Sequence, residues 1–178
     1  KKDAVKRIGI NFGAPGDRQD DSGTLWVDYP NKGGTSPSIP MTVKADSPRY
    51  FRRHSSLLKG DGVNWVAGSG VEGATSVTLT LSATEPKTPQ SYTVRLHFAE
   101  PDDAQPGERV FDIALQGKPM AENVDIARDS GDSNSAVVRE FANVEAGRSL
   151  KLDLIPRVGR PVLSGISVVA ATTGGAGQ

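Results

Sequence analysis

Two stretches of alternating side chains around a polar loop constrain the fold of this chain most. From residue 92 to residue 98, apolar residues alternate with polar ones, and the alternation resumes at residue 111. Successive side chains of a strand point to opposite faces of a sheet, so each stretch predicts a strand with one buried face. Two such strands joined by a loop predict an antiparallel pair with one face on the core. The predicted core residues are Val94, Leu96, Phe98, Phe111, Ile113 and Leu115.

The same period of two recurs along the chain, whereas helical spacing of apolar residues is almost absent. With 20 glycines and 12 prolines available for turns, many short strands predict an all-β protein, a two-sheet antiparallel β-sandwich. Further strands are predicted around Ile8, Ile10 and Phe12, around Val77, Leu79 and Leu81, around Val137, Val138 and Phe141, around Leu150, Leu152 and Leu154, and around Ile166 and Val168.

Two regions lack this period of two. Residues 13–76 show few clean strands, and the glycine-rich run 68–73 within them is interpreted as a turn, yet the region holds both tryptophans and two of the three tyrosines. A long irregular region in a compact domain is usually functional or disordered, and aromatic residues argue against disorder. Residues 172–178 are predicted to form a flexible tail or linker, which leaves residues 1–171 as a single domain.

Composition excludes several classes of function. The 21 basic and 21 acidic residues give a formal net charge of zero, which argues against a nucleic-acid partner and against a membrane surface. No apolar run is long enough to span a bilayer. The absence of cysteine excludes disulfides and thiolate metal sites, and no cofactor is predicted. The chain opens at Lys1 without an initiator methionine, so we expect a piece of a longer protein, and export stays open.

The irregular region contains the residues best suited to bind a sugar. Sugar rings dock their apolar faces on aromatic rings, while polar neighbours bond the hydroxyl groups. The alternative is that each ring packs inward and holds the region on the sandwich, because large aromatic side chains are mostly buried. The aromatic candidates are Trp26, Tyr29, Tyr50, Phe51 and Trp65.

Several motifs resemble one known family. The segments RIGINFG, LWVDYP, YTVRLHFAE, RVFDIALQGK and PVLSGISVV occur in this order from residue 7 to residue 169, and the chain is similar to malectin-like carbohydrate-binding domains. The resemblance implies a jelly-roll or galactose-binding-like sandwich. It also implies that loops at one edge bind glucose-containing oligosaccharides, with Tyr29 and Tyr50 in the tyrosine-bearing segments.

The chain departs from the family where ligand contacts are expected. Asp102 and Asp103 stand where animal members carry an aromatic pair, and Gly159 stands near the place of an aspartate, beside Arg157 and Arg160. The resemblance therefore implies either a different ligand or a vestigial sugar site. The loop 99–109 is expected to be exposed and to border the ligand, because its prolines cannot join a central strand and its acids prefer water.

Catalytic and metal chemistry have few candidates. Only His54 and His97 are present, and His97 is expected on the partly exposed face of its strand. Asp102 and Asp103 could form the carboxyl pair of a glycosidase, although an exposed acidic loop is the simpler interpretation. The acidic runs 17–21 and 129–134 could hold calcium but lack a spaced calcium-loop pattern, so no metal site is predicted. Arg49, Arg52 and Arg53 could hold an anionic sugar or a protein carboxylate, or simply be solvated.

The sequence thus predicts a non-catalytic carbohydrate-binding module of a larger exported bacterial protein, periplasmic or extracellular. Its predicted partners are an oligosaccharide or glycan and other domains of the parent protein. One alternative is a protein-interaction or structural assembly domain with a vestigial sugar site, and a weaker one is a glycoside-processing enzyme. The predicted binding residues are Tyr29, Tyr50, Trp65, Trp26, Phe51, Asp102, Asp103 and Arg157.

Overall fold

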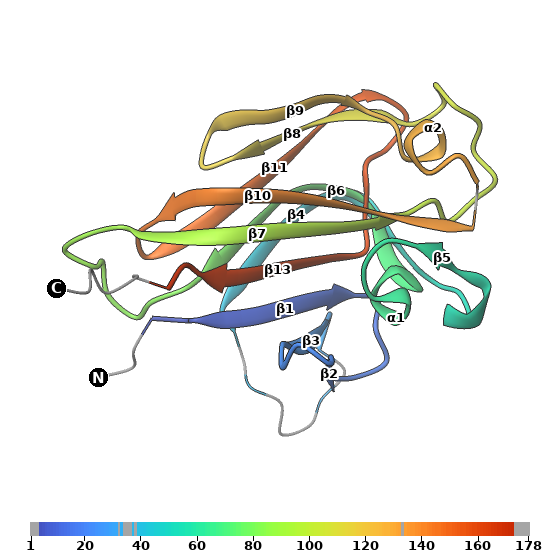
Figure 1. Cartoon of the computed structure of the whole chain (residues 1–178). Helices are drawn as coiled ribbons and strands as arrows, with labels where there is room; N and C mark the ends of the chain where they lie inside the picture. Colours follow the sequence, from blue (N-terminus) through green and yellow to red (C-terminus); the bar gives the residue numbers. More distant parts are fainter. Residues whose placement is uncertain (1–3, 32, 34–36, 38, 133, 173–178) are drawn as a thin grey trace, which may run out of the picture.

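The computed structural model describes residues 4–31, 33, 37, 39–132 and 134–172. They form two β-sheets packed face to face, with short helical segments gathered at one end (Figure 1). The predicted fold class, a two-sheet β-sandwich, is confirmed. The predicted tail lies outside the described residues except for its first residue, Thr172.

The first sheet contains seven strands in the order β2–β3–β1–β13–β7–β10–β5. The strands are β1 (Arg7–Phe12), β2 (Arg18–Gln19), β3 (Leu25–Tyr29), β5 (Lys59–Gly60), β7 (Gln90–Ala99), β10 (Ser135–Ala146) and β13 (Gly165–Ala170). β3 runs parallel to β1 and β5 parallel to β10, while the other neighbours are antiparallel.

The second sheet contains six strands, with β12–β6–β11–β8–β9 in order and β4 also paired to β6. The strands are β4 (Met41–Arg52), β6 (Ser69–Thr80), β8 (Val110–Leu115), β9 (Lys118–Val124), β11 (Ser149–Val158) and β12 (Val162–Leu163). The helical segments are the 3-10 turn η1 (Ser55–Leu57) and the helices α1 (Asn64–Ala67) and α2 (Ile126–Ser130).

The core lies between the sheets and is built from the alternating residues of the long strands. All six predicted core residues are at most 1% exposed, so this prediction is confirmed. Phe98 of β7 meets Phe111 of β8 across the interface, with ring centroids 5.7 Å apart. Each large apolar side chain buried in this way stabilises the fold by roughly 1.5–3 kcal/mol.

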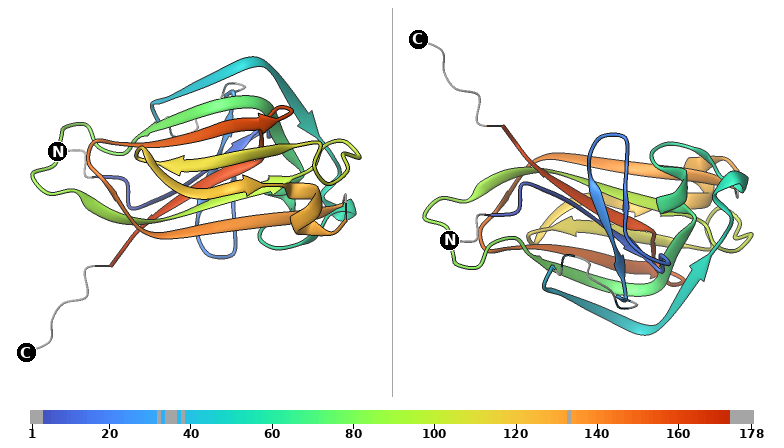
Figure 2. Two further views of the ribbon diagram at one scale, coloured as in Figure 1. Left: turned by 90° about the horizontal axis from the view of Figure 1, so that it is seen from above. Right: turned by 90° about the horizontal axis from the view of Figure 1, so that it is seen from below.

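The prediction that residues 13–76 hold few strands is wrong. β4 and most of β6 lie there and pair along almost their whole length, as the cyan and green ribbons show in Figure 2. β4 is largely exposed, and apolar residues alternate with polar ones only in its first five residues, 41–45. The run 68–73 is not a turn: Gly70 lies inside β6, where an added Cβ would come within 2.4 Å of the Phe51 ring. Glycine here makes room for a neighbouring ring.

Trp26 lies on the outer face of the first sheet and is only 2% exposed. Its indole crosses Gly9 of β1 and Gly165 of β13, because Cβ atoms at these glycines would come within 2.3 Å and 2.9 Å of ring atoms. Its Nε1 donates to Asp20, 2.9 Å away. The carboxylate of Asp20 also accepts from the backbone amide of Ser22, which binds the turn between β2 and β3 to the ring.

Gly9→Ala is predicted to destabilise the domain, since its methyl group would overlap the Trp26 ring. Overpacking of this kind costs about 1–3 kcal/mol, and urea denaturation measures the loss. Gly16→Ala is the matched control because nothing lies within 4 Å of its added methyl group. Equal stability of the two variants would contradict the close packing of Trp26 on β1.

Candidate functional site

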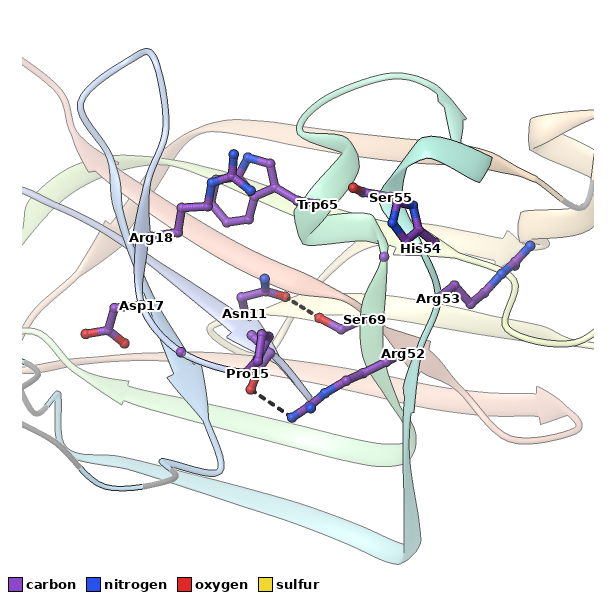
Figure 3. Close-up of a pocket in the computed structure, with 13 residues that line it drawn as sticks. Asn11, Pro15, Asp17, Arg18, Arg52, Arg53, His54, Ser55, Trp65 and Ser69 are labelled. Carbon is purple, nitrogen blue, oxygen red and sulfur yellow. Dashed lines mark hydrogen bonds between the residues drawn. The ribbon is translucent and has the colours of Figure 1, made fainter.

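A hollow of about 400 Å³ opens at the end of the sandwich that carries α1 (Figure 3). It lies between the β1–β2 loop and the segment that runs from the end of β4 to the start of β6. We call it the Trp65 pocket. Its lining residues are Asn11, Ala14, Pro15, Gly16, Asp17, Arg18, Arg52, Arg53, His54, Ser55, Trp65, Gly68 and Ser69.

One wall of the Trp65 pocket is the half-buried ring of Trp65, which α1 presents. The ring meets Trp26 edge-on, with centroids 6.2 Å apart and planes at 82°. The guanidinium of Arg18 stacks over Trp65, 4.7 Å from the ring centroid, and Figure 3 shows the two side chains together. Trp26 and Arg18 thus fix the orientation of the Trp65 ring, which the sequence predicted to be available for binding a sugar.

The floor of the pocket is polar and buried. Asn11 is only 3% exposed, and its side-chain oxygen accepts from the hydroxyl of Ser69 at 3.0 Å. Its amide nitrogen has no hydrogen-bond partner among the described residues, and Figure 3 shows it on the side away from Ser69. The pocket therefore offers a hydrogen-bond donor beside an aromatic wall. Sequence reasoning missed Asn11; an asparagine inside an otherwise apolar strand was the available signal.

Arginines form the opposite side of the pocket. Arg52 donates from Nε to the carbonyl of Gly13 and from Nη2 to the carbonyl of Ala14. Arg53 donates to the carbonyl of Glu100 and to the side-chain oxygen of Asn134. Both guanidinium groups are therefore held in place by oxygen atoms of the protein, and Arg52 positions the β1–β2 loop against β4.

The predicted binding residues do not form one site. Trp26 and Phe51 are buried, at 2% and 9% exposure, so they are corrected to packing residues that present no stacking surface. Trp65 lines the pocket described above. Tyr29 is half-buried against Phe12, with ring centroids 5.7 Å apart, and lines a separate hollow beside the prolines that follow it. Tyr50 is 37% exposed on β4.

Asp102 and Asp103 line another hollow, which we call the Asp102 hollow. Its lining residues are Glu72, Asp102, Asp103, Ala104, Glu108, Arg109, Gly159 and Arg160. The carboxylate of Asp102 pairs with Arg49 and lies 3.8 Å from Arg109. Glu72 pairs with Arg49 and lies 3.3 Å from Arg160. Asp102, the first of the two acids that replace the family's aromatic pair, is thus part of an ion-pair network.

The loop after β7 is exposed in its middle, as predicted, but its two ends are buried. Glu100 is 1% exposed and Arg109 is 8% exposed. Arg109 Nε lies 3.0 Å from Glu100, and this pair closes the base of the loop. Burial raises the pKa of Glu100, while its hydrogen bond to Arg109 opposes that rise.

Arg157 lies apart from these hollows. It donates to the carboxylate of Asp112 on the neighbouring strand β8, at 2.8 Å from Nε. The hydrogen bond from Arg157 lowers the pKa of Asp112. If Arg157 contacted a ligand, as the family resemblance implied, it would have to give up an ion pair that is already formed with Asp112.

His97 was expected to be partly exposed and is 4% exposed. Gly62 and Trp26 cover the outer face of β7 at this point: the ring of Trp26 lies 5.0 Å away, edge-on at 89°. Neither ring nitrogen has a hydrogen-bond partner among the described residues. Burial, aided by the charge of Arg95, lowers the pKa of His97 from its ordinary 6.5 to about 4.

The described residues hold no cluster of three acidic or histidine side chains suited to a metal ion. In the first run considered for calcium, Asp20 accepts from Trp26 and from its own turn. In the second run, Asp129 pairs with Arg128 and Arg139. Both carboxylates have local partners that account for their positions.

The structure belongs to the class of β-sandwiches in which loops at one end build a pocket. The lining of this pocket is partly aromatic and partly polar. The family model of the malectin domain matches residues 75–155. Receptor-like protein 4 of Arabidopsis thaliana is 36% identical over 87 residues, covering 47% of this chain and 14% of that protein. Over these residues the chain is similar to malectin domains, the family that its motifs resemble.

Solved structures share the fold at low identity. The plant peptide RALF23 in complex with FER and LLG2 gives a TM-score of 0.69 at 18% identity, covering 96% of this chain and 49% of that chain. The ANXUR1 extracellular domain from Arabidopsis thaliana gives 0.67 at 16% identity, covering 95% and 49%. Bacteroides uniformis β-glucuronidase 2 gives 0.67 at 13% identity, covering 93% and 18%. The chain therefore spans half or less of these proteins.

His97 makes the stability of the domain sensitive to acid. Below pH 6.5 the unfolded chain binds a proton at this histidine, whereas the folded protein resists until about pH 4. Stability from this group is thus complete above pH 6.5 and is lost as the pH falls to about 4. The loss is about 3 kcal/mol at most.

His97→Phe is predicted to flatten the decline in unfolding free energy between pH 6.5 and about 4. Denaturant titrations at several pH values measure it. His54→Gln, at an exposed histidine, is the matched control and should retain the wild-type decline. An NMR titration showing an ordinary pKa for His97 would contradict the prediction.

Proposed function

We propose that this chain is a non-catalytic carbohydrate-binding domain that binds an oligosaccharide in the Trp65 pocket. The observation that carries the proposal is the pairing of the half-buried Trp65 ring with the unpartnered amide nitrogen of Asn11. A sugar ring offers an apolar face to the indole and hydroxyl oxygens to the amide. Pockets that combine an aromatic wall with a few convergent polar groups are typical small-ligand sites.

The arrangement of carboxylates supports a binding role without hydrolysis. Asp17 is the one carboxylic acid among the residues that line the Trp65 pocket, and its Oδ1 accepts from the backbone amide of Asp28. Hydrolysis of a glycosidic bond ordinarily needs two carboxyl groups on either side of that bond. Asp102 and Asp103, the pair considered from sequence, line a different hollow.

The edge of the sandwich that carries Tyr50 and Asp102, which we call the loop edge, is a second candidate location for sugar binding. Tyr50 is 37% exposed, and its partial burial, with Tyr29 nearby, raises the pKa of Tyr50. The ion-pair network around Asp102 favours a second function for this edge, protein interaction, because Arg49 and Asp102 are half-exposed charged groups held in fixed positions. A charged patch of this kind suits a partner of complementary charge.

The domain is proposed to be part of a larger exported protein, bacterial by the style of its motifs. The similar plant structures include an extracellular domain, of whose chain this one spans 49%. No helix of the described residues has the length and apolar character needed to cross a membrane. Other domains of the parent protein are proposed as partners.

Trp65→Ala is predicted to weaken sugar binding by at least about two- to tenfold. Stacking on an aromatic ring contributes about 0.5–1.5 kcal/mol beyond the area buried, and each 1.4 kcal/mol is tenfold in affinity. A glycan array with the wild type selects the ligand, and titration calorimetry measures the variants.

Tyr50→Ala is the matched control, since it removes an exposed ring at the loop edge. If Tyr50→Ala weakens binding and Trp65→Ala does not, the sugar site lies at the loop edge. If no sugar binds the folded wild type, the protein-interaction function replaces the proposal. Circular dichroism confirms that both variants are folded.

A further inference from the structure

The Trp65 pocket is positively charged in a chain with no net charge. Arg18, Arg52 and Arg53 line it, and Asp17 is its one acid. With His54 neutral, the lining carries two net positive charges, whereas the whole chain carries a formal net charge of zero. The positive charge is therefore a local property of this pocket.

Arg52 keeps one edge of its guanidinium group free. Its Nε and Nη2 atoms donate to the carbonyls of Gly13 and Ala14, which occupies the side edge of the planar group. Nη1 has no hydrogen-bond partner among the described residues. The two carbonyls hold the plane in place, so the remaining edge is oriented before a ligand arrives. Such an edge matches the two oxygens of a carboxylate.

The rest of the pocket is rich in donors. Arg18 is exposed and its guanidinium stacks on the face of Trp65. Its guanidinium nitrogen atoms have no hydrogen-bond partner among the residues that the structure describes, so they can donate to a ligand. Asn11 adds an unpartnered amide nitrogen from the floor. Figure 3 shows Arg18 and Arg52 on opposite sides of Asn11. Neutral sugar hydroxyls need acceptors as well as donors, whereas a carboxylate only accepts.

We propose that the sugar bound in the Trp65 pocket is acidic and carries a carboxylate, as a uronic acid does. Arg52 binds the carboxylate through its free edge, Arg18 contributes a second positive charge, Asn11 donates to a ring oxygen or hydroxyl, and Trp65 stacks on the ring. This inference rests on the proposed function and specifies its ligand class.

The test compares each acid with its neutral form. Trisaccharides of glucuronic, galacturonic and mannuronic acid are titrated as free acids and as methyl esters, which keep the ring but remove the charge. At least one free acid should bind, and its methyl ester should bind about ten- to a hundredfold more weakly. The reason is that a hydrogen bond to a charged group contributes more binding free energy than one to a neutral group. Raising the salt from about 0.05 M to about 0.5 M should weaken binding of the acid.

Arg18→Gln is the main variant, because this exposed side chain anchors no loop. It should weaken binding of the acid by about tenfold more than it weakens binding of the ester, because both ligands use the Trp65 ring that Arg18 stacks on but only the acid uses the charge. Arg148→Gln is the matched control: it makes the same charge change in the β10–β11 turn, at the opposite end of the sandwich (Figure 1). It should bind as the wild type does.

The outcomes separate the two proposals. Equal affinity for acid and ester, or an unaffected Arg18→Gln variant, overturns recognition of a carboxylate. If no uronide binds but a neutral sugar binds and Trp65→Ala abolishes that binding, the acidic ligand is wrong and the Trp65 pocket stands. If neither kind of sugar binds the folded domain, both proposals fail.

Discussion

The packing of the Trp26 indole on the backbone of β1 and β13 is the contact on which the functional end of the sandwich depends. It requires Gly9 and Gly165, because any side chain there would occupy the volume of the ring. The buried ring then orients Trp65 on one side and covers His97 on the other. A single large residue outside the main core thus links the sheet to the pocket wall.

The sequence predicted those parts of the fold in which one periodic face is buried. β7 and β8 were predicted because their apolar residues alternate strictly. β4 was missed because it pairs at a sheet edge and stays largely exposed, and the first half of β6 was missed because glycines interrupt its pattern. His97 was misplaced for a related reason: alternation identifies two faces of a strand, but not whether a distant tryptophan covers the second one.

The site was harder to predict, because sequence motifs indicate which residue types are present but not which residues become neighbours in the folded chain. Trp65 was identified, but Asn11 and Arg18 were not, since they join it only after β1, β2 and α1 come together. Asp102 was expected to bond sugar hydroxyls, yet the arginine that holds it lies on β4, fifty-three positions away in the chain. Ion pairs between residues far apart in the sequence produce no periodic pattern from which they could be predicted.

The arrangement of the first and last strands has a mechanical consequence. β1 and β13 are antiparallel neighbours, with Arg7 opposite Val169 at one end and Asn11 opposite Gly165 at the other. A force that pulled the two strands apart from the Arg7 end would break their hydrogen bonds one pair at a time, like a zipper. The domain would then yield to tension by peeling, and the strand end beneath the Trp65 pocket would separate last.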